Sequence, residues 1–134
     1  MRNQERGFSV VMVIRDEGRV IAYYGLAPTA VAPRAAPRKI RTGQPPDPLP
    51  CLLIGQLAVD RRHQGRGLSG LLVLHALERI VLSADLTGGR AVIVNAVDQA
   101  AVGFWRGWGF VPSPSNPFQL LRSLDDIRAS LASS

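Results

Sequence analysis

The first third of the chain has the alternation of apolar runs and turn residues that is typical of paired strands. Residues 8–14 are apolar and β-branched, the sequence Asp-Glu-Gly follows at residues 16–18, and residues 19–26 form a second apolar run. This order predicts an antiparallel hairpin. Residues 28–50 then hold seven prolines among small and basic residues. We therefore expect an irregular connection there, without a long helix or a central strand.

The remainder of the chain alternates between strand and helix patterns. Apolar runs bounded by Gly, Pro or Asn indicate strands, and apolar residues that recur every three or four positions indicate helices. The predicted elements are, in order, a strand at 52–59, a helix from Gly67 to about residue 84, a strand at 91–96, a short helix from Asp98 to about Arg106, a strand at 118–121 and a terminal helix at 125–131. Asp98 is the expected N-cap of the short helix. Together these elements predict an α+β (mixed α/β) fold with a central mixed β-sheet flanked by helices.

Length and composition restrict the class of protein. A chain of 134 residues with 46% hydrophobic content suits a single domain, residues 1–134, with its own core. The sequence has no run of about 18 uncharged apolar residues and begins with charged residues rather than the apolar segment of a signal peptide. We therefore expect a cytoplasmic protein that is not inserted in a membrane. Cys51 lies in an apolar run and predicts a buried thiol, and one cysteine with two scattered histidines predicts no metal site and no disulfide.

The formal net charge is +6, and part of it is concentrated in the proline-rich connection. We define the basic loop as the segment that carries Arg34, Arg38, Lys39 and Arg41, which has no acidic residue between those positions. Such a cluster attracts polyanions with a strength that depends on salt. A solvated surface loop fits the same residues, so the pattern leaves RNA binding and simple solvation open.

The most informative motif stands between the predicted strand 52–59 and the helix that follows it. Arg62, Gly65 and Gly67 have the spacing RxxGxG. Glycines lack Cβ, so the backbone can approach a ligand closely, and the N-terminus of the next helix favours a phosphate group. A tight turn followed by a helix cap is the simpler interpretation. The spacing fits neither the Walker loop nor the GxGxxG dinucleotide motif.

With this motif the sequence resembles the GCN5-related N-acetyltransferases (GNAT), whose pyrophosphate signature is Arg or Gln, two residues, Gly, one residue, and Gly or Ala. The segments 19–28, 46–68 and 104–112 also resemble the acetyltransferase toxins of bacterial type II toxin-antitoxin pairs. The resemblance runs from about Phe8 to Ile127. In that group the acceptor is the amino group of an aminoacyl-tRNA.

The resemblance implies acetyl-CoA as the cofactor and assigns its binding residues. The backbone of the third strand would bind the pantetheine arm, the loop after it would bind the diphosphate, and a polar residue at the end of the next strand would bind the arm or the acceptor, unless it caps a helix or turn instead. The implied residues are Leu57, Ala58 and Val59 for the arm, Arg62, His63, Gln64, Gly65, Arg66, Gly67 and Leu68 for the diphosphate, and Asn95.

The resemblance places Trp105 at the catalytic position, where relatives carry a tyrosine in a pattern like FYxxFGF. An indole N–H donates a hydrogen bond but releases no proton at ordinary pH. Water would then have to protonate the departing thiolate, and we expect reduced activity. Packing in the core is the alternative interpretation of this tryptophan.

The expected function is therefore acetyl transfer to an aminoacyl-tRNA, with a ribbon-helix-helix antitoxin and a second copy of the chain as partners. The alternatives are an N-acetyltransferase for small amines or peptides, and a weakened acetyl-CoA-binding remnant. The family's usual first strand and two helices have no counterpart ahead of the hairpin. Three explanations fit the expected lack of these elements: a truncated reading frame, a degenerate enzyme, and completion of the site by another subunit.

Overall fold

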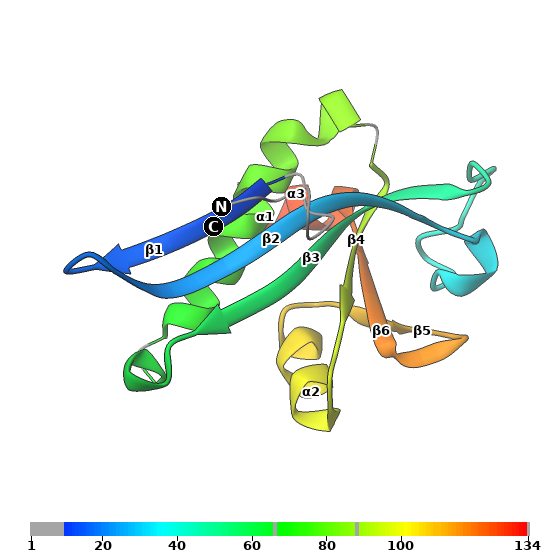
Figure 1. The fold of residues 1–134 in the computed structure, drawn as a ribbon. Coiled ribbons are helices and arrows are strands. Elements are labelled where there is room, and N and C mark those ends of the chain that lie inside the picture. The colour runs from blue at the N-terminus through cyan, green and yellow to red at the C-terminus, as the bar shows by residue number, and fades with distance from the viewer. Residues whose placement is uncertain (1–9, 66, 88, 134) are drawn as a thin grey trace.

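The computed structural model describes residues 10–65, 67–87 and 89–133. In this part of the chain a six-stranded mixed sheet has the order β1-β2-β3-β4-β6-β5. The strands are β1 (Val10–Asp16), β2 (Arg19–Val31), β3 (Leu49–Val59), β4 (Ala91–Asn95), β5 (Val111–Ser113) and β6 (Asn116–Ser123). The helices are α1 (Leu68–Thr87), α2 (Gln99–Gly107) and α3 (Leu124–Ala132). Among these described strands only β3 and β4 pair in parallel, so the predicted mixed α+β fold is confirmed (Figure 1).

The predicted hairpin is formed by β1 and β2, which pair from Val10 opposite Leu26 to Asp16 opposite Arg19. Glu17 and Gly18 have φ values of 51° and 79°. A two-residue turn with both φ values positive matches the right-handed twist of the flanking strands. Residues 1–9, on which the expectation of a strand beginning at Phe8 and the missing front segment depend, lie outside the described part of the chain.

The prediction for residues 28–50 was wrong at both ends of that range. β2 continues through Pro28 to Val31, and β3 begins at Leu49, with Pro50 opposite Ala30. Proline lacks an N–H and is therefore tolerated where a strand has no neighbour on one side. Within the described residues β1 pairs with β2 only as far as Leu26, so no described strand lies beside the last residues of β2 on that side. Irregular structure is confined to the segment between these strands.

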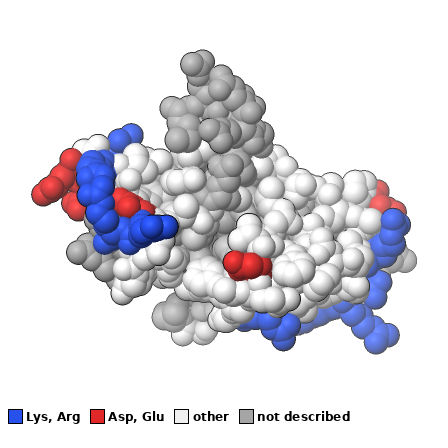
Figure 2. All heavy atoms as spheres, turned by 60° about the horizontal axis from the view of Figure 1, so that its bottom comes forward, with Lys and Arg blue, Asp and Glu red and all other residues white. Residues whose placement is uncertain are grey.

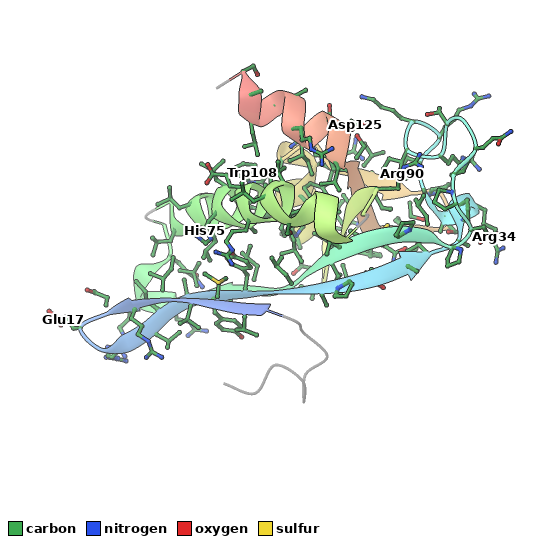
Figure 3. All side chains as sticks on the ribbon, turned by 90° about the horizontal axis from the view of Figure 1, so that it is seen from above. Glu17, Arg34, His75, Arg90, Trp108 and Asp125 are labelled. Atoms are coloured by element: carbon green, nitrogen blue, oxygen red, sulfur yellow. The ribbon has the colours of Figure 1, made fainter. Side chains whose placement is uncertain are left out.

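The main core lies between the sheet and the helices. Leu72, Val73 and Ile80 of α1 are buried against Tyr24 of β2 and Ile54 of β3. Seen from above, α1 and α3 lie on the same side of the sheet (Figure 3). A smaller apolar cluster occupies alternate positions of the strands and is covered by buried residues of the proline-rich connection; it consists of Ala36, Ile40, Leu49, Cys51, Ala91, Ile93 and Leu121.

Side-chain caps mark where α2 and α3 begin. The Asp98 carboxylate accepts a hydrogen bond from the Ala101 N–H at 2.8 Å, which confirms Asp98 as the N-cap of α2. Ser123 Oγ accepts from the Asp126 N–H at 3.0 Å and caps α3 in the same way. α1 ends at Thr87, beyond the predicted end near residue 84. Among the described helices, none is long and apolar enough to cross a membrane.

Candidate functional site

The site begins where two strands part. β3 and β4 are paired from Cys51 opposite Ala91 to Ile54 opposite Val94, and β4 ends one residue later while β3 continues to Val59. Figure 1 shows the two strands diverging beyond this pairing. We call this divergence the fork. Beyond the fork, no described strand lies beside the second half of β3 on the β4 side.

A β-bulge in β3 lies at the fork. Ala58 is opposite Tyr23 and Gly55 is opposite Gly25, so Gln56 and Leu57 together face a single residue of β2. A bulge of this kind bends the strand and interrupts the regular ladder. Neither register gives Leu57 a partner residue among the described strands. The peptide groups of this segment are therefore placed beside the fork, where a ligand could take the position of a missing strand.

A cavity of about 280 Å³ occupies the fork. We call it the fork cavity, and its lining residues are Ile54, Leu57, Ser69, Asn95, Val97, Ala101, Phe104 and Trp105. It therefore brings together three residues that the sequence had suggested, Leu57, Asn95 and Trp105. The sequence had given no indication of Ser69 or Phe104. The only local indication is their place in the sequence: Ser69 stands two residues after Gly67, and Phe104 stands directly before Trp105.

The loop that follows β3 is shaped by its own polar side chains. The Asp60 carboxylate accepts a hydrogen bond from the Arg62 N–H at 3.2 Å, and Gln64 Nε2 donates to the Val59 carbonyl at 3.1 Å. The side chain of Gln64 thus closes the loop onto the end of β3. The side chain of Arg62 is exposed. Arg66 and the side chain of His63 lie outside the described part of the structure.

Gly65 and Gly67 both have a left-handed backbone conformation. Their φ values are 83° and 75°, in the region that disfavours L side chains, and a Cβ built on either would meet no atom within 4 Å. The Leu71 N–H donates to the Gly67 carbonyl at 3.1 Å and opens the hydrogen-bond ladder of α1. The first N–H groups of a helix have no acceptor within the helix, and Leu68 is the first residue of α1. Open space, glycine backbone and a helix N-terminus together form a suitable anion cradle.

Trp105 packs in the core and also lines the fork cavity. Its side chain is 7% exposed, and its ring meets Phe104 and Phe110 edge-to-face with centroid distances of 5.2 Å in each case. For Trp105 the sequence left open a place at the catalytic position and packing in the core, and these two interpretations are therefore compatible. A rigid aromatic wall on α2 faces the end of the bulged strand across the cavity.

Asn95 is the polar residue at the end of β4. Its Oδ1 accepts a hydrogen bond from Gln119 Nε2 at 3.4 Å, and its side chain is exposed. The N-cap of α2 is Asp98, so Asn95 does not cap that helix. Its amide N–H₂ group can still donate to a ligand in the fork cavity.

Tyr24 and His75 lie away from the fork cavity. Tyr24 is fully buried, and its hydroxyl lies 2.6 Å from His75 Nδ1. Burial raises the pKa of the Tyr24 phenol, and the nearby Arg79 lowers it to a smaller extent. The pair lines a separate groove together with Met12 and Leu71. Tyr24 is therefore not among the residues that line the fork cavity.

Cys51 is buried beneath the proline-rich connection, and burial raises the pKa of its thiol to about 11. A thiol with so high a pKa is a poor nucleophile near neutral pH. Within the described residues, no group of three or more His, Cys, Asp and Glu side chains could hold a metal ion.

The basic loop lies at the end of the sheet opposite the glycine motif. Arg34, Arg38, Lys39 and Arg41 are all exposed. β3 runs between the two regions, and its 11 residues at about 3.3 Å each span about 35 Å. Figure 3 shows Arg34 and the hairpin residue Glu17 at opposite ends of the molecule. In Figure 2, Lys and Arg side chains gather at both ends of the visible face, with largely uncharged surface between them.

Comparison with known proteins gives consistent results. Residues 1–110 match the acetyltransferase (GNAT) family. The chain is 40% identical over 129 residues to a tRNA-acetylating toxin of Mycobacterium tuberculosis (strain ATCC 25618 / H37Rv), covering 96% of this chain and 77% of that protein.

Two solved structures have a similar fold. AtaT complexed with acetyl-methionyl-tRNAfMet matches with a TM-score of 0.84 and 25% identity, over 96% of this chain and 78% of that chain. A mutant AtaT toxin bound to the C-terminus of the antitoxin AtaR and acetyl-CoA matches with a TM-score of 0.68 and 25% identity, over 84% of this chain and 66% of that chain.

Proposed function

The chain belongs to the acetyltransferase (GNAT) family, and we propose that it is a tRNA-acetylating toxin that transfers the acetyl group of acetyl-CoA to an aminoacyl-tRNA. One observation carries the proposal. A fork between parallel strands, a glycine loop and a helix N-terminus lie together in a chain 40% identical to a tRNA-acetylating toxin.

The residues around the fork suit acetyl-CoA, which supplies an acetyl group activated as a thioester. The peptide groups of Leu57, Ala58 and Val59 lie along the open edge of β3 and would bind the pantetheine arm. The backbone of Gly65 and Gly67 and the first N–H groups of α1 would hold the diphosphate. Arg62, which is exposed beside this loop, adds positive charge for the phosphates.

Acetyl transfer to an amine needs a deprotonated amine, stabilisation of the developing oxyanion and a proton for the departing thiolate. The bulged backbone at Leu57 offers peptide groups for the oxyanion, and the Asn95 amide and the Ser69 hydroxyl are the polar side chains of the fork cavity. The Trp105 indole can orient the sulfur with its N–H but cannot protonate it. We therefore propose that the thiolate takes its proton from water and that the enzyme is slower than a relative with tyrosine at this position.

We assign acceptor binding to the basic loop. Arg34, Arg38, Lys39 and Arg41 are exposed, and the length of β3, about 35 Å, lies between them and the glycine motif. A tRNA is long enough to touch the loop with its backbone while its aminoacyl end enters the fork cavity. Phosphate contacts of this kind supply affinity without sequence selectivity.

We further propose two protein partners. The first is an antitoxin, supported by the fold shared with the AtaT toxin bound to the C-terminus of AtaR; its ribbon-helix-helix type is what the resemblance to toxin-antitoxin pairs implies. The second is another copy of the chain, as the resemblance to dimeric acetyltransferase toxins implies. Co-purification with the product of a neighbouring antitoxin gene tests the first partner, and light scattering of the isolated chain tests the second.

The decisive experiment offers labelled acetyl-CoA to the purified chain with charged tRNAs, and follows label that precipitates with RNA and is released by mild alkali as acetyl-amino acid. Deacylated tRNA and N-blocked aminoacyl-tRNA are the matched controls and should remain unlabelled. Transfer to free amino acids or peptides, with none to charged tRNA, would establish the small-amine alternative instead.

Trp105 favours one further alternative, a weakened acetyl-CoA-binding remnant, because it removes the expected proton donor while leaving the cofactor-binding backbone intact. Calorimetric binding of acetyl-CoA without turnover on any charged tRNA would support that alternative. Binding together with slow turnover supports the enzyme.

A further inference from the structure

We propose that Arg122 is a positioning residue for acetyl transfer, which fixes the C-terminal end of α2 and thereby the Trp105 indole in the fork cavity. The inference rests on the proposed function. Arg122 belongs to β6, where it is paired with Val92 of β4. It does not line the fork cavity, so it acts through the residues that it holds.

The Arg122 guanidinium makes two short contacts in a nearly buried position. Nη1 donates to the Trp108 carbonyl at 2.9 Å, and Nε donates to Asp126 Oδ2 at 2.7 Å. The Arg122 side chain is only 12% exposed. A planar guanidinium bound through two separate nitrogens has a fixed orientation, and hydrogen bonds between charged groups are stronger than neutral ones. β6, α3 and the end of α2 are thus joined at one side chain.

The contact to Trp108 leads directly to Trp105. Trp108 is the C-cap of α2, and the N–H groups of Trp108 and Phe110 donate to the Trp105 carbonyl at 3.0 and 3.1 Å. The Phe110 ring also packs edge-to-face on the Trp105 indole. The peptide that Arg122 holds is therefore part of the turn that fixes both the backbone and the ring of Trp105.

Gly109 shows how closely the turn and the guanidinium fit. Its φ is 84°, and a Cβ built on it would lie 3.0 Å from Arg122 Nε and 3.1 Å from Arg122 Cζ. A side chain at residue 109 would press on the guanidinium, so the turn and Arg122 are in close contact and a shift of one disturbs the other. Misplacement of a reacting group by about 1 Å can cost about 10²-fold in rate.

Asp126 holds the guanidinium from the opposite side and offers a matched test. It lies in the first turn of α3, next to Asp125, whose side chain is 97% exposed and 3.6 Å from Arg128. Figure 3 shows Asp125 at the start of α3. Asp126→Asn and Asp125→Asn make the same chemical change at adjacent positions of one helix. Only the first removes a charge from Arg122.

The experiment measures kcat and the KM for acetyl-CoA separately in four variants. Arg122→Gln should lower kcat by about 10–100-fold with little change in KM for acetyl-CoA, because the cofactor-binding backbone is untouched. Arg122→Lys keeps the charge but loses the planar guanidinium with its two separate donor nitrogens. Its kcat should lie between those of Arg122→Gln and the wild type. Asp126→Asn should lower kcat in the same direction by a smaller factor, and Asp125→Asn should match wild type.

A second, spectroscopic readout does not depend on activity. It tests the orientation of Trp105 directly in the more conservative variants and therefore separates this proposal from the proposed function. In a Trp108→Phe background, Trp105 is the only tryptophan, so its fluorescence and near-UV circular dichroism report the indole alone. Arg122→Lys and Asp126→Asn should increase acrylamide quenching and weaken the dichroism. Unchanged spectra, or folded variants with wild-type kcat, would overturn the positioning role. If the wild type acetylates no charged tRNA, the proposed function fails while the spectra still decide on Arg122.

Discussion

Ile54 and Val94 are the last parallel partners of β3 and β4, and the fork cavity opens directly beyond them. On the near side of this pair the strands are held together by buried residues such as Leu52 and Val92. On the far side the bulge opposite Tyr24 bends β3 away. The sheet is thus closely packed on one side of the pair and, among the described strands, open on the other, which places the peptide groups of β3 beside the fork cavity.

Gly67→Ala should weaken acetyl-CoA binding. At a φ of 75° an alanine strains the backbone or moves it out of the positive-φ region, and either change displaces the amides that face the diphosphate. The loss of one or two hydrogen bonds to a charged group corresponds to about 10–100-fold in Kd, measured by calorimetry. Gly43→Ala is the control, because Gly43 has a φ of 76° and equally open surroundings but lies in the proline-rich connection. Equal losses of affinity in both variants would contradict a specific role for Gly67.

The sequence predicts most of the fold because local patterns determine it. The Glu17–Gly18 turn, the Asp98 cap and the apolar face of α1 each act within a few residues. Strand ends near proline are less predictable. The cost of a proline depends on whether a neighbour pairs with that side of the strand. For Pro28, the described part of β1 begins at Val10, opposite Leu26, and so gives it no partner on that side.

The candidate site is only partly predictable for a related reason. Gly65 and Gly67 stand out in the sequence by residue type and spacing, and the positive φ of both is one that glycine adopts readily. The place of Ser69 and Phe104 in the fork cavity depends on where two strands separate and how α1 and α2 pack. That is a property of topology, and no pattern around either residue indicates it.

Trp105→Tyr should raise the turnover of acetyl transfer by up to about 10²-fold, because a phenol can protonate the departing thiolate whereas an indole cannot. The cavity remains lined by an aromatic ring, so the Kd for acetyl-CoA should change little. Steady-state kinetics at saturating cofactor measures the effect. Trp108→Tyr is the control and should bring no gain. A fall in turnover in a folded Trp105→Tyr protein would show that water is not the limiting donor.

Neutralising the basic loop should weaken tRNA binding without affecting the cofactor. Replacing Arg34, Arg38 and Arg41 with Gln should raise the KM for charged tRNA and reduce the slope of log affinity against log salt by about 1 for each lost phosphate contact. The same replacement at Arg15 and Arg19, which are exposed in the hairpin, should have a smaller effect. Fluorescence titration at several salt concentrations gives both slopes. If the two sets of variants lower the slope equally, only general charge attracts the RNA.

Cys51 should be inert in the folded protein. Its thiol is 2% exposed, and burial raises its pKa to about 11, so little thiolate is present at pH 8. We expect no reaction with a disulfide reagent under native conditions and one equivalent of thiol after unfolding in guanidinium chloride. Rapid modification in the native state would show that the proline-rich connection opens readily above β3.

Asp126 should make stability depend on pH through its bond to Arg122. The hydrogen bond from Arg122 lowers the pKa of this carboxyl group, and the charges of Arg122 and Lys39 act in the same direction. A carboxyl group with a lower pKa in the folded state stabilises the protein above the unfolded pKa, near 3.9, and loses that effect as pH falls through the folded pKa. The Asp126 side chain is 40% exposed, so we expect Asp126→Asn to cost only about 0.5–1 kcal/mol at pH 7. In urea titrations the difference in the free energy of unfolding should shrink below about pH 4. Asp125→Asn, which shares the helix N-terminus but does not contact Arg122, should cost less at pH 7. A difference that persists unchanged at pH 3 would show that the amide disturbs packing and that the ion pair contributes nothing.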